Sequence, residues 1–200
     1  MLRRLMMAGA AVAPAYTTLN PADKAANVTL SGGNLVASMG TANSGFARAV
    51  HGKSSGKHYF EAVVAQNGST GVDECSVGLA TSSHTASAAL GYSSAAGWAL
   101  WGWGGSGFRN GSLVLSSSAM TNGAVVGFAV DLDNDRLWVS VNGTWLQGNP
   151  SAGTSPLSTN LTGTIYPAAC PWKNNIITMR FNPAGHSYSP PTGFTAGWTT

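Results

Sequence analysis

The sequence predicts an all-β protein built as an antiparallel β-sandwich, and three observations carry this prediction. Glycine and proline are frequent, with 26 and 9 residues in a chain of 200, which indicates many turns. Short runs of strand length recur along the chain, separated by segments rich in Gly, Ser and Asn. From residue 16 onward, apolar residues do not recur at helical spacing over three turns, so we expect no long helix. Many short strands joined by turns are typical of a sandwich.

The chain divides into an extension, residues 1–15, and a domain, residues 16–200. In the extension two arginines precede an apolar run, and Ala11-Val12-Ala13 resembles the cleavage site of a secretory signal. The run is too short to span a bilayer, which takes about 20 apolar residues. We expect a peptide that docks on another surface; the alternatives are a terminus folded back on its own domain and a true signal of a secreted bacterial protein. The predicted anchoring residues are Arg3, Arg4, Leu5, Met6 and Met7.

The first part of the domain predicts a helical turn followed by a hairpin. Asn20-Pro21-Ala22-Asp23 combines a capping side chain, Pro at the first helical position and a carboxylate at the third, and Asn27 ends the helix. Val28–Ser31 and Asn34–Ala37 then flank Gly32-Gly33. Because glycine accepts the positive φ of a primed turn, we expect a two-residue hairpin loop here.

Further strands are expected in apolar or alternating runs between turn-rich segments, at residues 58–65, 75–80, 97–103, 126–132, 136–142, 165–169 and 176–181. Apolar residues alternate in 126–132 and again in 136–142, and Asp133-Asn134-Asp135 turns the chain between them. This pattern predicts an antiparallel hairpin. Residues 165–169 and 176–181 are expected to close the series as a pair.

The succession of short motifs resembles the SPRY domain family over roughly residues 16–194. The motifs are Gly56-Lys57-His58-Tyr59-Phe60-Glu61, Val77-Gly78-Leu79, Leu90-Gly91, Val126-Gly127-Phe128-Ala129-Val130-Asp131, Leu137-Trp138-Val139-Ser140-Val141-Asn142-Gly143, Ile165-Tyr166-Pro167, Arg180-Phe181-Asn182 and Tyr188-Ser189-Pro190-Pro191-Thr192-Gly193-Phe194. His58 and Phe60 stand where the family often carries Trp. The Gly-, Ser- and Ala-rich composition is similar to SPRY modules of bacteriophage and bacterial proteins rather than to those of animal ubiquitin ligases. The resemblance implies a bent, concanavalin-like jelly roll that binds partners through its loops and has no catalytic centre.

Composition and motif spacing exclude several kinds of chemistry. Charged residues make up 8% of the chain against about 25% in typical proteins, and clustered cations beyond Arg3-Arg4 are lacking, so nucleic acid is not an expected partner. A nucleophile elbow and a facing pair of carboxylates are also lacking, so we expect no enzyme. Cys75 and Cys170 lack metal-ligand spacing; two separate buried thiols are favoured over one disulfide.

A second metal candidate is the run Asp131-x-Asp133-x-Asp135, which begins like a calcium loop. Its sixth position is Arg136 where glycine is needed, and its twelfth is Asn142 where glutamate is needed. We therefore expect these aspartates to cap backbone amides in a turn, and we expect neither a metal site nor a cofactor.

The candidate binding surface is an aromatic cluster on the strand predicted at 97–103. Side chains alternate along a strand, so Trp98 and Leu100 share one face and the tryptophans at 101 and 103 share the other. One set lines the core, and the other either binds a partner or is itself covered. The candidate residues are Trp101, Trp103, Phe108 and Arg109.

These features predict a non-catalytic structural and interaction protein of a bacteriophage virion, as a capsid decoration or a tail or collar component. Its expected partners are other virion proteins, in a multi-copy assembly, and its expected location is the virion. The alternative is a module that binds a host-surface carbohydrate or receptor through the tryptophan-bearing strand, or a secreted bacterial protein of the same family.

Overall fold

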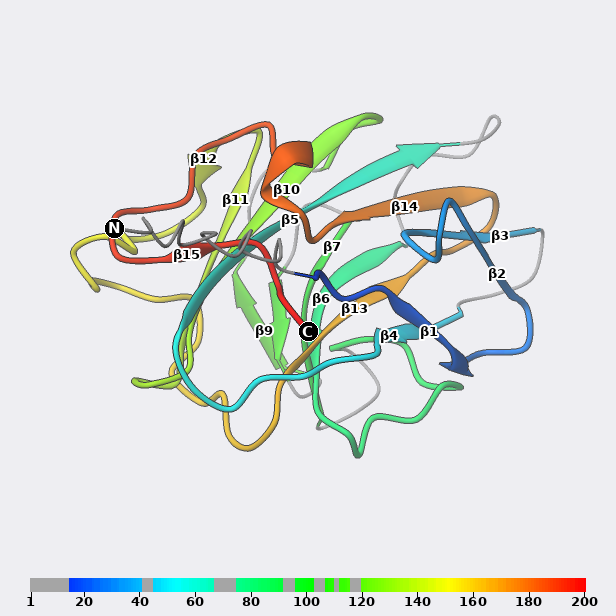
Figure 1. Ribbon diagram of the computed structural model, residues 1–200, viewed down its shortest axis with the longest axis horizontal. Coiled ribbons are helices and arrows are strands. Elements are labelled where there is room, and N and C mark those ends of the chain that lie inside the picture. The colour runs from blue at the N-terminus through cyan, green and yellow to red at the C-terminus, as the bar shows by residue number, and fades with distance from the viewer. Residues whose placement is uncertain are drawn as a thin grey trace, which may run out of the picture.

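The computed structural model is a sandwich of two antiparallel β-sheets packed face to face (Figure 1). It describes residues 15–40, 45–66, 75–91, 96–102, 107–109, 112–115 and 120–200. The predicted all-β antiparallel class is confirmed. The predicted anchoring residues in segment 1–14 lie outside the described residues.

The first sheet runs, in spatial order, β1 (Leu19–Lys24), β4 (Ala47–Ala49), β13 (Tyr166–Cys170), β6 (Ser76–Ala80), β7 (Gly97–Trp101), β8 (Gly107–Arg109) and β9 (Ser112–Leu115). The second sheet runs β12 (Thr144–Trp145), β11 (Arg136–Val141), β10 (Ala124–Asp131), β5 (Lys57–Gln66), β14 (Asn175–Arg180), β3 (Val36–Met39) and β2 (Val28–Ser31). Strand β15 (Thr195–Ala196) continues the line of β14 and pairs in parallel with the start of β5. A 3-10 turn, Pro183–Gly185, stands between β14 and β15.

The core lies between the sheets and is built by strand alternation. Phe60, Ala62 and Val64 of β5 face inward, as do Phe128 and its neighbours two residues away on β10. The Phe60 and Phe128 rings stack with centroids 4.9 Å apart. Each fully buried side chain of this size stabilises the fold by about 1.5–3 kcal/mol.

The hairpin predicted around Asp133 is confirmed: β10 and β11 pair in the register Asp131↔Arg136. Asp131 and Asp133 act as caps, as expected. The Asp131 carboxylate accepts hydrogen bonds from the backbone N and the side-chain Nδ2 of Asn134, and the Gly56 backbone N donates to Asp133 Oδ1 at 2.7 Å. Asp131 therefore holds the turn itself, and Asp133 joins it to the segment before β5.

The predicted helix at 20–27 is wrong, because this segment contains strand β1 instead. Asn20 does use its capping side chain, since its Oδ1 accepts from the Ala22 backbone N at 2.9 Å. The chain nevertheless pairs with β4, with a register shift between Leu19 and Lys24. Pro21 is tolerated because β1 is an edge strand, where a missing N–H costs little. Pairing with a neighbouring strand outweighs the local helix signal.

Three further details of the sequence prediction are corrected. The hairpin of β2 and β3 forms, but Ser31 pairs with Val36, so its loop has four residues and not two; Asn34 joins the two glycines at positive φ. Strands β13 and β14 do not pair with each other, because they lie in different sheets. Strand β7 ends at Trp101.

The structure shows two buried thiols rather than a disulfide, as favoured from the sequence. Cys75 belongs to the core between the sheets, whereas Cys170 lies in a separate cluster on the outer side of the first sheet. Burial raises the pKa of the Cys170 thiol, which keeps it protonated.

The outer face of the second sheet is covered by the chain that follows β14, drawn from orange to red in Figure 1. One fully buried carboxylate, Glu61 of β5, holds this cover in place. Its Oε2 accepts from the backbone N of Ser187 at 2.7 Å and from Arg180 Nη1 at 3.4 Å, and its Oε1 accepts from the backbone N of Tyr188 at 2.8 Å. The Tyr59 hydroxyl donates to Oε1 at 2.9 Å, and burial followed by the Glu61 charge raises the pKa of Tyr59, so the donor stays protonated. We call these five residues the Glu61 clasp.

We expect Glu61→Gln to destabilise the protein by about 3 kcal/mol, because an amide N–H₂ would face a backbone N–H and the Arg180 partner would lose its counter-charge. At about 2–4 °C per kcal/mol for a chain of this size, the melting temperature should fall by about 6–12 °C. Tyr59→Phe is the control: it removes a single hydrogen bond and should cost about 1 kcal/mol. Melting of Glu61→Gln at the temperature of the unmodified protein would contradict the role of the clasp.

Candidate functional site

The loop formed by residues 81–91 crosses the outer face of the first sheet. That face is built from small side chains, Ala80, Ala99 and Ala168, which let the loop pack closely. Leu90 fills the remaining space and is fully buried beside Phe46. The loop is thus part of the packed structure, although it connects two strands at the surface.

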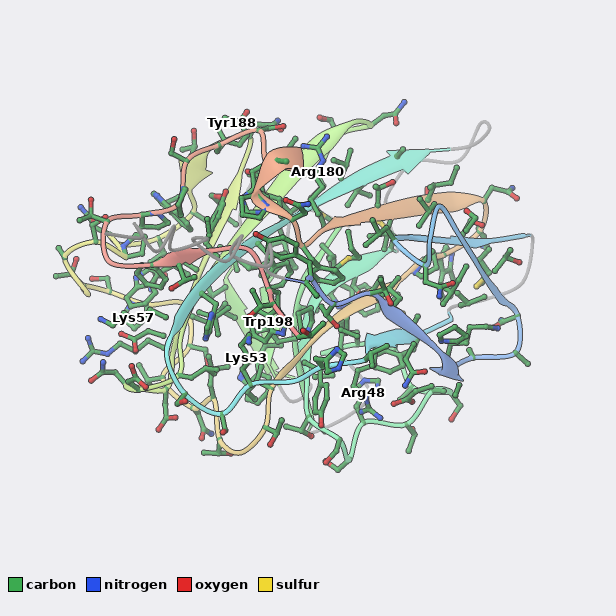
Figure 2. All side chains as sticks on the ribbon, in the orientation of Figure 1. Arg48, Lys53, Lys57, Arg180, Tyr188 and Trp198 are labelled. Carbon is green, nitrogen blue, oxygen red and sulfur yellow. The ribbon has the colours of Figure 1, made fainter. Side chains whose placement is uncertain are left out.

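Arg48 of β4 fastens the start of this loop. Its Nε donates to Asp23 Oδ2 at 2.8 Å, and its Nη2 forms a second bond to the same oxygen. Its Nη1 donates to the backbone O of Thr81 at 2.5 Å and reaches the backbone O of His84 at 3.4 Å. Arginine suits this position because its planar guanidinium group carries five N–H donors, enough to bond β1 and the loop at the same time. Figure 2 shows Arg48 at this side of the sandwich.

His84 fixes the middle of the loop by stacking on Phe46, with ring centroids 4.3 Å apart. The imidazole is 3% exposed. Burial, followed by the nearby Arg48 charge, lowers the pKa of His84 from 6.5 to about 4. The ring is therefore neutral at pH 7.

The end of the loop is held by a residue of the predicted binding surface. Trp101 Nε1 donates to the backbone O of Leu90 at 2.9 Å, and the half-buried indole packs on the outer side of the sheet. Trp98 and Leu100 lie in the core and Trp101 lies on the outer side, so the expected division of faces is observed for these three residues. Trp101 positions the loop in this structure; its contact with a partner stays a prediction.

Trp103 lies outside the described residues, as do the side chains of Phe108 and Arg109. The backbone register of Phe108 and Arg109 is known: Phe108 pairs with Ala99, and Arg109 pairs with Trp98. The structure therefore brings Trp101 to the 81–91 loop and leaves the remaining three candidates as predictions.

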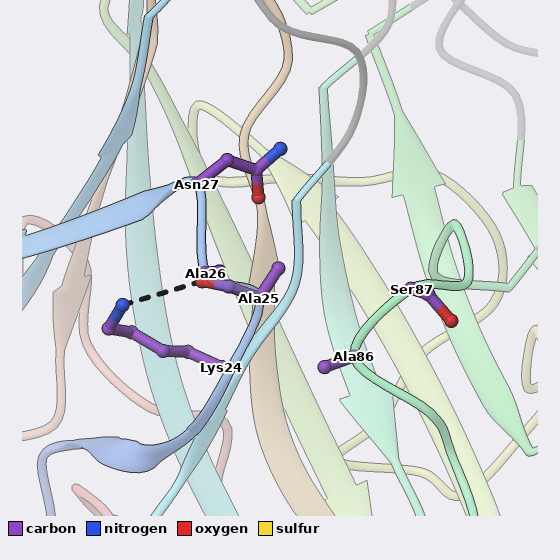
Figure 3. A pocket seen from close by; sticks show the side chains of 6 residues that line it. All are labelled: Lys24, Ala25, Ala26, Asn27, Ala86 and Ser87. Atoms are coloured by element: carbon purple, nitrogen blue, oxygen red, sulfur yellow. Dashed lines mark hydrogen bonds between the residues drawn. The ribbon is translucent and has the colours of Figure 1, made fainter.

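A hollow of about 390 Å³ lies between the loop and the β1–β2 turn (Figure 3). Ala86 and Ser87 form one wall, and Lys24, Ala25, Ala26 and Asn27 form the other. Lys24 Nζ donates to the backbone O of Val28 at 2.7 Å and of Ala25 at 3.4 Å. These two bonds hold the Lys24 side chain against the β1–β2 turn.

The exposed side chains of the loop are uncharged and carry hydroxyl groups: Ser82, Ser83, Thr85 and Ser87. Such a surface can exchange hydrogen bonds with a polar chain without burying a charge. The arrangement suits recognition rather than bond-making chemistry.

The described part of the chain has no group of three or more His, Cys, Asp or Glu side chains placed to hold a metal ion. Within the same residues, no helix has the length and apolar character needed to cross a membrane.

The residues that build this site were missed by sequence reasoning because their partners are distant in the chain. Asp23, Arg48 and His84 come from β1, β4 and the loop, and local spacing relates none of them. A charged residue inside the short apolar run Phe46–Val50 was the available signal, since an arginine in a buried strand needs a partner.

We expect His84 to make the protein less stable in mild acid. The unfolded chain takes up a proton on this ring near pH 6.5, whereas the folded chain does so only near pH 4, so stability present above pH 6.5 is lost as the pH falls toward 4. The loss between pH 7 and pH 5 is about 2 kcal/mol. His84→Phe keeps the stacked ring and should remove this part of the pH dependence, measured by denaturant unfolding at both pH values. An unchanged difference between the two pH values in His84→Phe would contradict this assignment.

Comparisons with known proteins agree on one family. A protein-family model described as the SPRY domain matches residues 57–183, which is more than half of the chain. No curated protein matches the chain. Among solved structures, the SPRY domain of human HERC1 is similar with a TM-score of 0.64 at 15% identity, over 81% of this chain and 96% of that one. The PSpry domain of TRIM65 is similar with a TM-score of 0.62 at 13% identity, over 84% and 93%. At such identities the structures show a shared fold, and the match of the family model shows that this chain belongs to the SPRY domain family.

Proposed function

We propose that this domain is a non-catalytic protein-interaction module whose partner binds the 81–91 loop and the hollow beside it. SPRY domains are typically interaction modules without catalysis, which supports this class of function. The observation that favours this surface is the set of hydrogen bonds made by Arg48, which fasten an exposed, hydroxyl-bearing loop to the sheet.

Holding the loop in place matters because a mobile segment must become ordered when it binds a partner, and this ordering costs free energy. A loop held by Arg48, by the His84–Phe46 stack and by Trp101 is already ordered, so less of the contact energy is lost on association. The uncharged exposed side chains favour a partner held by hydrogen bonds and shape. We therefore expect affinity that changes little with salt.

The wider setting that we propose is the bacteriophage virion, with other virion proteins as partners and with residues 1–15 as the anchoring peptide. The low charge, the basic and apolar start of the sequence and the similarity to phage and bacterial SPRY modules support this proposal. Mass spectrometry of density-purified particles and antibody labelling under the electron microscope test it. We expect the protein at a constant copy number per particle. Its loss from particles during purification would contradict a virion role.

To test the binding surface, a photo-crosslinking amino acid is placed at position 87 in the native assembly, and at position 144 as a control. Thr144 is exposed and lies on β12, at the edge of the other sheet. We expect a crosslink to a defined protein from position 87 and not from position 144.

With that protein identified, Ser87→Arg should weaken binding at least about tenfold, because it places a large charged side chain on an exposed and otherwise uncharged surface of the loop. The melting temperature should change by no more than about 2 °C, since an exposed substitution costs about 0.5 kcal/mol or less. Thr144→Arg is the matched control and should bind normally. Equal binding by Ser87→Arg and Thr144→Arg would place the partner elsewhere.

A further inference from the structure

A second hollow, of about 270 Å³, opens where the chain after β14 covers the second sheet. It is separate from the 81–91 loop, which lies over the first sheet. Its lining residues are uncharged at pH 7: Pro183, His186, Ser187, Tyr188, Ser189, Pro190 and Ala196. Figure 2 shows Tyr188 at the rim of the molecule, near Arg180.

Tyr188 is an exposed aromatic ring that is nevertheless held in place. It is 37% exposed, unlike most large apolar side chains of the described residues. One edge of the ring packs on Gly143 in the β11–β12 turn, where an added Cβ would lie 2.5 Å from Tyr188 Cε1. Asn142 and Gly143 hold this turn at φ 49° and 78°, in the left-handed region. Below the ring, the Tyr188 backbone N is bound by Glu61. The ring is thus held in place while part of its surface stays exposed.

Ser187 supplies an oriented hydroxyl next to this ring. Its Oγ accepts from Arg180 Nη1 at 2.6 Å, so its proton is left to donate. A charged donor on the oxygen strengthens the hydroxyl as a donor in turn. The Ser187 backbone N is bound by Glu61, which fixes the position of the residue.

His186 contributes a neutral ring at the base of the hollow. Its Nε2 lies 3.1 Å from the backbone O of Arg180, which can only accept, so Nε2 carries the proton and Nδ1 keeps its lone pair. Burial lowers the pKa of His186, which keeps the ring uncharged at pH 7. Because Nδ1 is buried, His186 contributes only its neutral ring, and the hydroxyls of Ser187, Tyr188 and Ser189 supply the side-chain donors and acceptors of the hollow.

We propose that this hollow binds one hexose unit of a glycan, with the pyranose ring stacked on Tyr188 and its hydroxyls bonded to Ser187 and Ser189. A pyranose matches the lining because it presents apolar C–H groups on one face and hydroxyls at its edge. The lining residues carry no charge, and the neighbouring Arg180 is already paired with Glu61, so the hollow favours a neutral ligand. The volume lies just below the usual range for drug-sized ligands, which suits a single small ring. This site is independent of the 81–91 loop, so it extends the proposed function and does not rest on it.

The test is a titration of the full chain with methyl glucoside, methyl galactoside, methyl mannoside and N-acetylglucosamine. Binding is measured from the changes in the NMR shifts of Tyr188 and His186. We expect saturable binding of at least one sugar with a dissociation constant of about 1–10 mM, as one small ring in a shallow site allows. Tyr188→Ala should weaken it about tenfold or more, whereas Tyr188→Phe keeps the ring and should stay within about twofold. Ser87→Arg, in the other hollow, is the control and should bind sugar normally.

Three outcomes would overturn the proposal. These are the absence of saturable shifts with all four sugars, sugar binding that Tyr188→Ala leaves unchanged, and equal loss of binding in Ser87→Arg. Thermal melting of Tyr188→Ala and Tyr188→Phe shows that each variant is folded before its binding is compared.

Discussion

The buried Glu61 carboxylate is the interaction on which most of the C-terminal architecture depends. A charge with no exposed surface is tolerated because two backbone N–H groups, a phenol and Arg180 surround it. By fixing residues 187 and 188, the clasp allows Phe194 to pack against Tyr59 and Trp138, and β15 to join β5. Trp198 then enters the core, and residues 198–200 pair with residues 15–17. Both ends of the domain are thereby joined at the same place.

The outer face of the first sheet is also covered by a segment that a buried charged side chain holds in place. A sheet with apolar residues on both sides needs a cover, and a loop used as a cover brings polar backbone that must be bonded. Arg48 meets this need for the 81–91 loop, as Glu61 does for residues 187–188. In each case one buried charged side chain accepts or donates to backbone groups of the cover and is itself balanced by an opposite charge. Each cover is thus ordered while part of it stays exposed, and each borders a hollow.

Alternation and turn chemistry predicted the central strands, because both are local. The β10–β11 hairpin followed from alternating apolar residues around Asp133, and the division of faces at Trp98 and Trp101 followed from the pleat. The helix prediction at Asn20-Pro21 was wrong because pairing with β4 depends on residues far along the chain. The candidate sites could not be predicted from the sequence for the same reason, because their contacts join distant residues: Arg48 binds Thr81, and Glu61 binds Ser187. Which aromatic face is covered is decided by a loop whose path no local pattern encodes.

The two hollows have no lining residue in common, so the two proposed ligands would not compete for the same residues. A protein bound at the 81–91 loop leaves the surface at Tyr188 facing away from it, because the sandwich separates the two covers. A single hexose bound to one shallow hollow is held weakly, and useful adhesion then requires many copies displayed together. An assembly that arrays the domain through its first sheet would supply those copies. If both proposals hold, weak recognition at Tyr188 and attachment at the 81–91 loop would complement each other, and substitutions at position 87 and position 188 would separate them.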